Sequence, residues 1–213
     1  QYATIFAKNN LMKIAVLNGE PWQMDFLKNI SDTELITAQN TEMLFAQKAN
    51  AFIIFNITQE YLNIKEDNLP VLLGCVCKSN KEMNVAANVI RFNDWNGFLE
   101  KTKWEISGET TPGILNLFHH LGKEPIFCSD VPGFISARII ALIINEAYIA
   151  LAEGVSTKGE IDIAMRLGTN YPYGPFEWCE KIGRKNIYFL LSNLSNSDER
   201  YLPAPLLVKE CNL

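Results

Sequence analysis

The chain has 213 residues, of which 48% are hydrophobic and 20% charged, which is enough apolar material for one large or two small folded domains. Its net charge of −5 argues against nucleic acid or an anionic membrane as a partner, because both attract concentrated Lys and Arg. The longest apolar run in the second half, residues 139–144, is far shorter than the roughly 20 residues of a membrane-spanning helix. The first ten residues lack the pattern of a signal peptide, so we expect a cytoplasmic protein.

Short apolar segments rich in β-branched residues alternate with amphipathic segments at the start of the chain. The predicted strands are residues 13–17, 33–38, 51–57 and 71–77, and the predicted helices between the first three are residues 21–30 and 41–49. Thr41 is the expected N-cap of the second helix. The order strand, helix, strand, helix, strand predicts right-handed crossovers and a parallel sheet.

The predicted sheet continues to about Asp130. Two further strands are expected near Val89 and Trp104, followed by a helix over 112–122 and a last strand within 125–130. After Gly133 the pattern contains helices only. The fold class expected is therefore α/β, with a parallel-sheet domain over 1–130 followed by an all-α domain over 131–213.

Cap signals divide the second half into helices. Residues 133–154 are apolar on nearly all sides, which predicts a helix buried in a core or subunit interface, with Gly154 at its C-terminal cap. Thr157 and Glu160 form the pattern of a capping box opening the helix 158–168, which we expect to stop at Gly168. Further helices are predicted from Pro175 to Gly183, over 186–194 and at the C-terminus.

The five cysteines are an odd set in a chain that is large enough to fold without disulfides, so we expect reduced thiols. Cys75 and Cys77 share one face of a strand, but no further ligands follow at the spacing of a metal site. We therefore interpret them as core thiols and expect no metal.

Several ordered motifs in the second half carry a family resemblance. They are Pro-Gly-Phe at 132–134, Asn-Glu-Ala at 145–147, Glu-Gly-Val at 153–155, Ile-Asp at 161–162 with Ala-Met at 164–165, and Gly168 followed by Pro172 and Gly-Pro-Phe at 174–176. Over about residues 122–210 this pattern resembles the C-terminal domain of the 3-hydroxyacyl-CoA dehydrogenases, including the 3-hydroxybutyryl-CoA enzymes. The resemblance implies a Rossmann-like first domain, here shortened, a homodimer formed through the helices, and NAD-dependent oxidation of an acyl-CoA in the cleft between the domains.

Such oxidation needs a base for the hydroxyl proton, a carboxylate that orients the base, and a donor to the forming carbonyl. The family supplies His, Glu and Asn for these roles. Here Arg91 or Asn93 stands at the His position, depending on a small gap, and neither is a base at neutral pH. Ala137 stands at the Asn position and has no polar atom on its side chain. Only Glu105 remains, and because no histidine is left for it to orient, we favour the reading that it is a polar residue pointing outward from a strand.

Two other parts of the resemblance differ as well. The family's Ser-Asn-Thr-Ser stretch corresponds to residues 74–80, where most hydroxyls are replaced. The chain's two histidines, His119 and His120, lie on the helix before Gly122 and cannot replace the missing base without rearrangement. We interpret this pair as surface or interface residues.

The stretch Val-Leu-Asn-Gly-Glu-Pro-Trp-Gln-Met at 16–24 occupies the place of the dinucleotide-binding fingerprint Gly-x-Gly-x-x-Gly. Gly19 is its single glycine, Glu20 adds negative charge, Trp22 is bulky, and Pro21 removes an N–H donor. After the second strand, residues 38–40 are Ala-Gln-Asn, without the acidic residue that binds the adenosine ribose. We therefore expect no cofactor to be bound.

These observations favour a family member of acyl-CoA metabolism that is catalytically impaired and has a binding or structural role. The alternative is an active NAD-dependent 3-hydroxyacyl-CoA oxidoreductase that uses Glu105 with Asn93 or Lys103 in an atypical site. A third reading is a protein that binds an acyl-CoA ester without chemistry.

Overall fold

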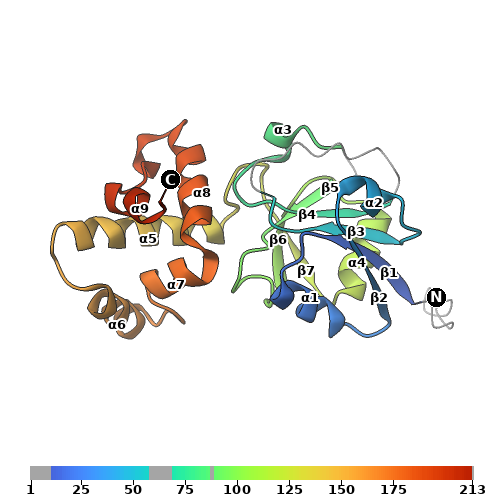
Figure 1. Cartoon of the computed structure of the whole chain (residues 1–213), viewed down its shortest axis with the longest axis horizontal. Helices are drawn as coiled ribbons and strands as arrows, with labels where there is room; N and C mark the ends of the chain where they lie inside the picture. Colours follow the sequence, from blue (N-terminus) through green and yellow to red (C-terminus); the bar gives the residue numbers. More distant parts are fainter. Residues whose placement is uncertain (1–10, 58–68, 87–88, 213) are drawn as a thin grey trace.

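The computed structural model describes residues 11–57, 69–86 and 89–212, and consists of a sheet part and a helical part (Figure 1). The strands are β1 (Met12–Leu17), β2 (Thr33–Ala38), β3 (Ala51–Ile54), β4 (Val71–Gly74), β5 (Val89–Phe92), β6 (Lys103–Ser107) and β7 (Glu124–Phe127). The helices of the sheet part are α1 (Pro21–Lys28), α2 (Thr41–Phe45), α3 (Asn80–Met83) and α4 (Pro112–His120). The helical part holds α5 (Ser136–Ala152), α6 (Lys158–Thr169), α7 (Pro175–Ile182), α8 (Arg184–Ser195), the 3-10 turn η1 (Glu199–Tyr201) and α9 (Pro205–Glu210).

The seven strands form one sheet in the order β2-β1-β3-β4-β5-β6-β7. All neighbours pair in parallel except β5 and β6, which are antiparallel. The expectation of a parallel sheet is thus correct except at this pair. Residues 93–102 join the two strands by turns without a helix, and a parallel return needs a crossover of a dozen or more residues. The strand reversal therefore follows from the short connection.

Two apolar layers cover the sheet. One face packs against α1 and α4, with Leu27 and Phe118 buried there. The other face packs against α2 and α3 through Leu44 and Met83. The alternation of side chains along each strand divides its residues between these layers, and the central strands β3 and β4 are buried at every position. The sheet is therefore a Rossmann-like layer with helices on both faces.

The helix ends confirm some predicted caps and correct others. Gly154 lies beyond α5 with φ 73°, and Val155 N–H donates to Ala150 O at 3.0 Å, which is the expected C-terminal cap. The capping box of Thr157 and Glu160 opens α6 as predicted.

Two predicted caps are wrong, and α2 ends at Phe45 rather than at residue 49 as expected. Asn40, not Thr41, caps α2, because its Oδ1 accepts from Met43 N–H at 2.8 Å. Helix α6 continues past Gly168 to Thr169, and Asn170 ends it with φ 57°. Asparagine tolerates the left-handed conformation almost as glycine does, so it competes for this position.

The two parts share packing contacts. Trp95 and Cys77, which follow β5 and β4, belong to the same buried cluster as α5, α7 and α8. Phe98 stacks on Trp178 of α7 with ring centres 5.5 Å apart. Among the described residues, no helix is both long and apolar enough to cross a membrane.

Candidate functional site

Glu105 on β6 is bound to the first residue of α5. Ser136 donates its N–H to Glu105 Oε1 at 2.9 Å and its hydroxyl to the same oxygen at 2.7 Å. Asn93 Nδ2 lies 3.3 Å from Glu105 Oε2, because residue 93 follows β5 opposite residue 105 in the antiparallel register. The Glu105 side chain is buried, and both of its oxygens accept hydrogen bonds from these two neighbours. The carboxylate thus joins the sheet to the start of the helical part.

Arg91 lies on the same face of β5 as Asn93 but has different partners. Its guanidinium is fully buried and donates to Cys75 O at 2.9 Å and to Val131 O at 2.8 Å. It also pairs with Asp130 at 3.4 Å. Of the two candidates for the family's His position, only Asn93 contacts Glu105. Arg91 instead binds the segment that leads into α5.

The position aligned with the family's Asn is apolar and closed. Ala137 is completely buried in the core of the helical part. Its neighbour Ser136 supplies the only polar side chain that this turn directs at Glu105. Lys103, the other proposed partner of Glu105, is exposed and lies 3.9 Å from Glu124 instead.

The turn over residues 16–24 forms a closed hydrogen-bonded structure. Glu20 N–H donates to the side chain of Gln23 at 2.9 Å, and Trp22 Nε1 donates to the Glu20 carboxylate at 2.7 Å. Pro21 is the first residue of α1. A Cβ placed on Gly19 would lie 2.5 Å from Met24 Sδ, so a larger residue there would displace the Met24 side chain. The amide and the charge at this helix start are therefore already engaged within the chain.

A buried polar cluster that the sequence analysis missed lies beside this turn. Gln23 and Asn56 exchange side-chain hydrogen bonds at 2.9 and 3.2 Å. Asn56 N–H donates to Asp94 Oδ2 at 2.7 Å, and Gln23 Nε2 lies 3.5 Å from Asp94 O. A Cβ on Gly74 would collide with the Asp94 carboxylate. The signals in the sequence were a polar residue, Asn56, inside the predicted strand 51–57, the polar residues after the strand near Val89, and a glutamine on α1.

Asp94 is strongly perturbed by this position. It is 3% exposed, and burial raises its pKa to about 7, opposed by the hydrogen bond from Asn56 and reinforced by the charge of Glu20. Because the unfolded chain loses this proton near pH 4, the free energy of unfolding falls as the pH rises toward about 7.

The two histidines lie at the opposite edge of the sheet. His120 Nε2 is 2.8 Å from Thr33 Oγ1, at the amino end of β2, whereas Asn93 and Asp94 follow the carboxyl end of β5. Of the sequence-predicted site residues, the structure therefore brings Asn93 alone into contact with Glu105. Arg91 and Lys103 have other partners, and His119 and His120 lie away from the site.

All five cysteines are free thiols. Burial raises the pKa of Cys75 to about 11, so this thiol stays protonated at neutral pH. Within residues 11–57, 69–86 and 89–212, no three His, Cys, Asp or Glu side chains are grouped as they would be around a metal ion.

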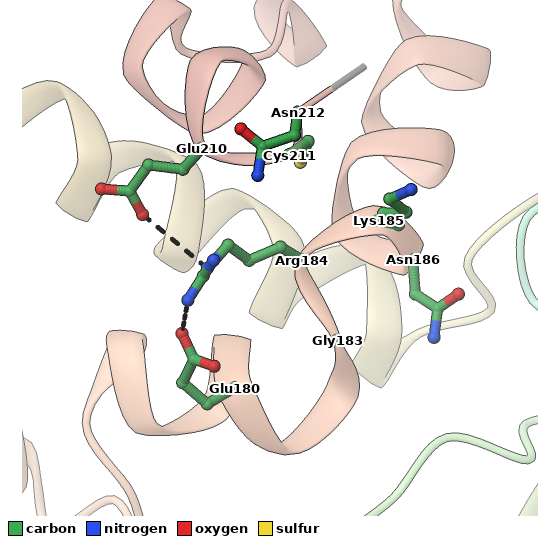
Figure 2. A pocket seen from close by; sticks show the side chains of 8 residues that line it. All are labelled: Glu180, Gly183, Arg184, Lys185, Asn186, Glu210, Cys211 and Asn212. Atoms are coloured by element: carbon green, nitrogen blue, oxygen red, sulfur yellow. Dashed lines mark hydrogen bonds and ion pairs between the residues drawn. The ribbon is translucent and has the colours of Figure 1, made fainter.

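One cavity lies beside Glu105 and another lies in the helical part. A cavity of about 320 Å³ lies on the outer side of Glu105, and is lined by Asn93, Phe98, Lys101, Lys103, Trp104, Glu105, Ile126 and Ser136. The second, of about 430 Å³, lies between the start of α8 and the end of α9 (Figure 2).

Figure 2 shows Arg184 in this second cavity reaching toward both Glu180 and Glu210. Glu210 also accepts from Lys158 at 2.7 Å and from Tyr148 at 2.9 Å. Partial burial opposes ionisation of Glu210, but the bonds from Lys158 and Tyr148 hold its pKa below the ordinary value. Glu210 therefore connects α9 to α5, α6 and α8 through a hydrogen bond from Tyr148 and ion pairs with Lys158 and Arg184.

Comparison with known proteins identifies the helical part. Residues 133–212 match the model of the 3-hydroxyacyl-CoA dehydrogenase C-terminal domain. The chain is 48% identical over 88 residues to a 3-hydroxyadipyl-CoA dehydrogenase of Escherichia coli, which is 40% of this chain and 18% of that protein. It is 42% identical over 91 residues to a 3-hydroxybutyryl-CoA dehydrogenase of Bradyrhizobium diazoefficiens, or 42% of this chain and 31% of the relative. The chain thus matches less than half the length of these relatives.

Solved structures extend the likeness of fold over both parts. The (S)-3-hydroxybutyryl-CoA dehydrogenase of Ralstonia eutropha superposes with a TM-score of 0.70 over 93% of each chain, at 19% identity. A 3-hydroxybutyryl-CoA dehydrogenase of Escherichia coli superposes at 0.64 over 94% of this chain and 56% of the other, at 17% identity. The sheet and helical parts together therefore have the fold of these enzymes, and residues 133–212 match the C-terminal domain of the 3-hydroxyacyl-CoA dehydrogenases.

Proposed function

We propose that this chain is a family member of acyl-CoA metabolism that does not transfer hydride and that has a binding or structural role. The observation that carries the proposal is the bonding of Glu105. Its carboxylate accepts from Ser136 and Asn93, and no imidazole is present for it to orient. Both histidines lie at the other edge of the sheet. Loss of a general base alone lowers a rate by about 10²- to 10⁴-fold.

The residues at the carboxyl edge of the sheet do not fit a dinucleotide. Binding of a pyrophosphate needs free backbone N–H groups at the start of α1, yet Pro21 has none and the Glu20 amide is bonded to Gln23. The Glu20 carboxylate repels a phosphate at the same place. Gln23, Asn56 and Asp94 satisfy one another in the adjoining space. A cofactor would have to break these bonds and overcome the negative charge.

The helical part supports a homodimer. Leu167 on α6 is 84% exposed and Ile163, one turn earlier, is 49% exposed, while Ile139 on α5 is 52% exposed. Exposed apolar side chains at helical spacing are typical of a surface that associates. We expect a mass of two chains by size exclusion with light scattering, and Leu167→Asp to shift the population toward single chains.

The function is tested by thermal melting with NADH and with acetoacetyl-CoA, separately and together, at about millimolar concentration. A ligand that binds only the folded state must raise the Tm. We expect no shift with NADH, because the site is closed by its own side chains. A shift with acetoacetyl-CoA alone would assign the protein a role in binding acyl-CoA esters.

A dehydrogenase that binds NADH serves as the positive control in the same buffer. A rise in Tm with NADH that is larger in the presence of acetoacetyl-CoA would contradict the proposal, and would favour an oxidoreductase with NAD as cofactor. No shift with any ligand would leave a structural role.

A further inference from the structure

The turn between β1 and α1 carries an Asn-Gly pair in an open position. Asn18 is exposed, and neither Asn18 nor Gly19 belongs to a strand or a helix. Asn18 has φ 57°, the left-handed conformation that asparagine tolerates. Among the residues that the structure describes, the side-chain amide of Asn18 has no hydrogen-bond partner, and the Gly19 N–H has no acceptor. Within the described fold, the amide group and the glycine nitrogen are therefore free to react.

An Asn-Gly pair of this kind undergoes an intramolecular reaction. The backbone nitrogen of Gly19 loses its proton and attacks the side-chain carbonyl carbon of Asn18. The new C–N bond replaces the bond to the amide nitrogen, which leaves as ammonia, and a five-membered imide remains. Water then opens the imide at either carbonyl and leaves an aspartate or an iso-aspartate at position 18. Glycine favours the ring closure because it has no Cβ to hinder the approach of its nitrogen.

One hydrogen bond restrains the peptide group between the two residues. Asn56 Nδ2 donates to Asn18 O at 2.9 Å. The peptide group has to rotate before the nitrogen of Gly19 attacks, so this bond opposes the reaction. A single hydrogen bond of this kind changes an equilibrium by about tenfold at most. Folding should therefore slow the reaction at Asn18 only modestly.

A second Asn-Gly pair, Asn96 and Gly97, has a different environment. Asn96 is half-buried, and the Gly97 N–H donates to Glu100 Oε2 at 3.2 Å. Gly97 also packs against the ring of Trp178, from which an added Cβ would lie 2.5 Å away. The attacking nitrogen is engaged here and its peptide group is packed. The fold thus opposes the same reaction much more strongly at Asn96.

We propose that Asn18 is a site of spontaneous deamidation in the folded protein and that Asn96 is protected. The product changes the buried polar cluster beside the turn, because it adds a negative charge next to Glu20. An iso-aspartate also lengthens the main chain by one carbon and displaces the oxygen that Asn56 binds, and Asn56 in turn binds Asp94. This modification site does not depend on hydride transfer or on an acyl-CoA ester, so it goes beyond the function proposed above.

Peptide mass spectrometry measures both sites in one sample. The full chain is incubated at mildly alkaline pH and then digested at acidic pH, where the reaction is slow. Deamidation raises the mass of a peptide by about 1 Da, and fragmentation locates the change. In the folded chain we expect the rate at Asn18 to lie within about tenfold of the rate in urea, and the rate at Asn96 to be more than about tenfold slower than at Asn18. In urea the two sites should react at similar rates, because both are Asn-Gly pairs.

Two variants assign the reaction and its effect. Asn18→Gln retains the amide but would need a six-membered ring, so the mass increase in this peptide should disappear. Asn96→Gln is the matched control and should leave the rate at Asn18 unchanged. After incubation the natural chain should melt about 2 to 4 °C below the fresh chain, as expected for one lost hydrogen bond, and Asn18→Gln should not. Melting curves of the fresh variants verify that each is folded.

The outcomes separate this site from the proposed function. Equal rates at Asn18 and Asn96 in the folded chain would overturn the proposal. A rate at Asn18 that folding lowers by more than about tenfold would do the same. An equal fall in Tm for the natural chain and Asn18→Gln would refute the effect on the polar cluster. A Tm shift with NADH would instead count against the absence of hydride transfer and would leave the deamidation result standing.

Discussion

Replacement of Asp94 by Asn should stabilise the protein at alkaline pH and not at acidic pH. Asp94 is 3% exposed, and burial, reinforced by Glu20, raises its pKa from 3.8 to about 7. The folded chain therefore holds a proton that the unfolded chain releases above about pH 4. The stability that this proton contributes is complete below the unfolded pKa of 3.8, falls as the pH rises, and is lost by about pH 7.

The size of the effect follows from the same values. A pKa raised from 3.8 to about 7 corresponds to a loss of about 4 kcal/mol in the free energy of unfolding. Asn retains an oxygen that accepts from Asn56 N–H, but its new N–H₂ group needs an acceptor, and an unmet donor costs about 1 to 3 kcal/mol. The net gain expected at pH 8 is about 2 kcal/mol, or about 4 to 8 °C in Tm for a chain of this size.

The assay compares melting curves of the natural chain and of Asp94→Asn from pH 5 to pH 8.5. The difference in Tm between them should grow from pH 5 to about pH 7 and level off at higher pH. Asp25→Asn is the matched control, since its side chain is 68% exposed, and its difference should not grow in this way. If the curves of Asp94→Asn and the natural chain stay parallel over the whole range, the assignment of a buried, half-protonated carboxyl is wrong.

Three further substitutions test the contacts between the sheet and the helical part. Glu105→Gln should lower the free energy of unfolding by about 1 to 3 kcal/mol, because the charge-assisted bonds to Ser136 are weakened, and an unchanged urea midpoint would refute their importance. Arg91→Met should lower the free energy of unfolding by about 3 to 5 kcal/mol, because it leaves two backbone carbonyl groups and Asp130 without a donor. A free energy of unfolding equal to that of the natural chain would show that water replaces the guanidinium. Gly97→Ala should lower the free energy of unfolding by about 1 to 3 kcal/mol, since Gly97 has φ +95° and the alanine Cβ would lie 2.5 Å from the Trp178 ring. A Tm equal to that of the natural chain would contradict this packing.

Much of the fold follows from local patterns in the sequence. The strand segments near residues 13, 33, 51, 71 and 89 form the parallel part of the sheet, because a buried strand needs only a short apolar run rich in β-branched residues. Gly154 and the capping box of Thr157 end and begin helices where they were expected. The reversal of β6 could not be derived in the same way, since strand direction depends on the connecting segment and on the neighbouring strand.

The contacts of the candidate site could be predicted from the sequence only in part. Alignment alone left Arg91 and Asn93 as alternatives at one position, and only the antiparallel register places Asn93 opposite Glu105. Gln23, Asn56 and Asp94 were missed because they lie far apart in the chain and meet through three separate elements. Long-range polar contacts of this kind have no local periodicity.

The hydrogen bonds at Glu105 leave this carboxylate without a base to orient for hydride transfer. The most direct measurement is the rate of acetoacetyl-CoA reduction by NADH, for the natural chain and for Glu105→Gln at equal concentration. We expect no turnover above the background of the variant, because Glu105 binds Ser136 and Asn93 and orients no base. Turnover by the natural chain that Glu105→Gln abolishes would contradict this expectation.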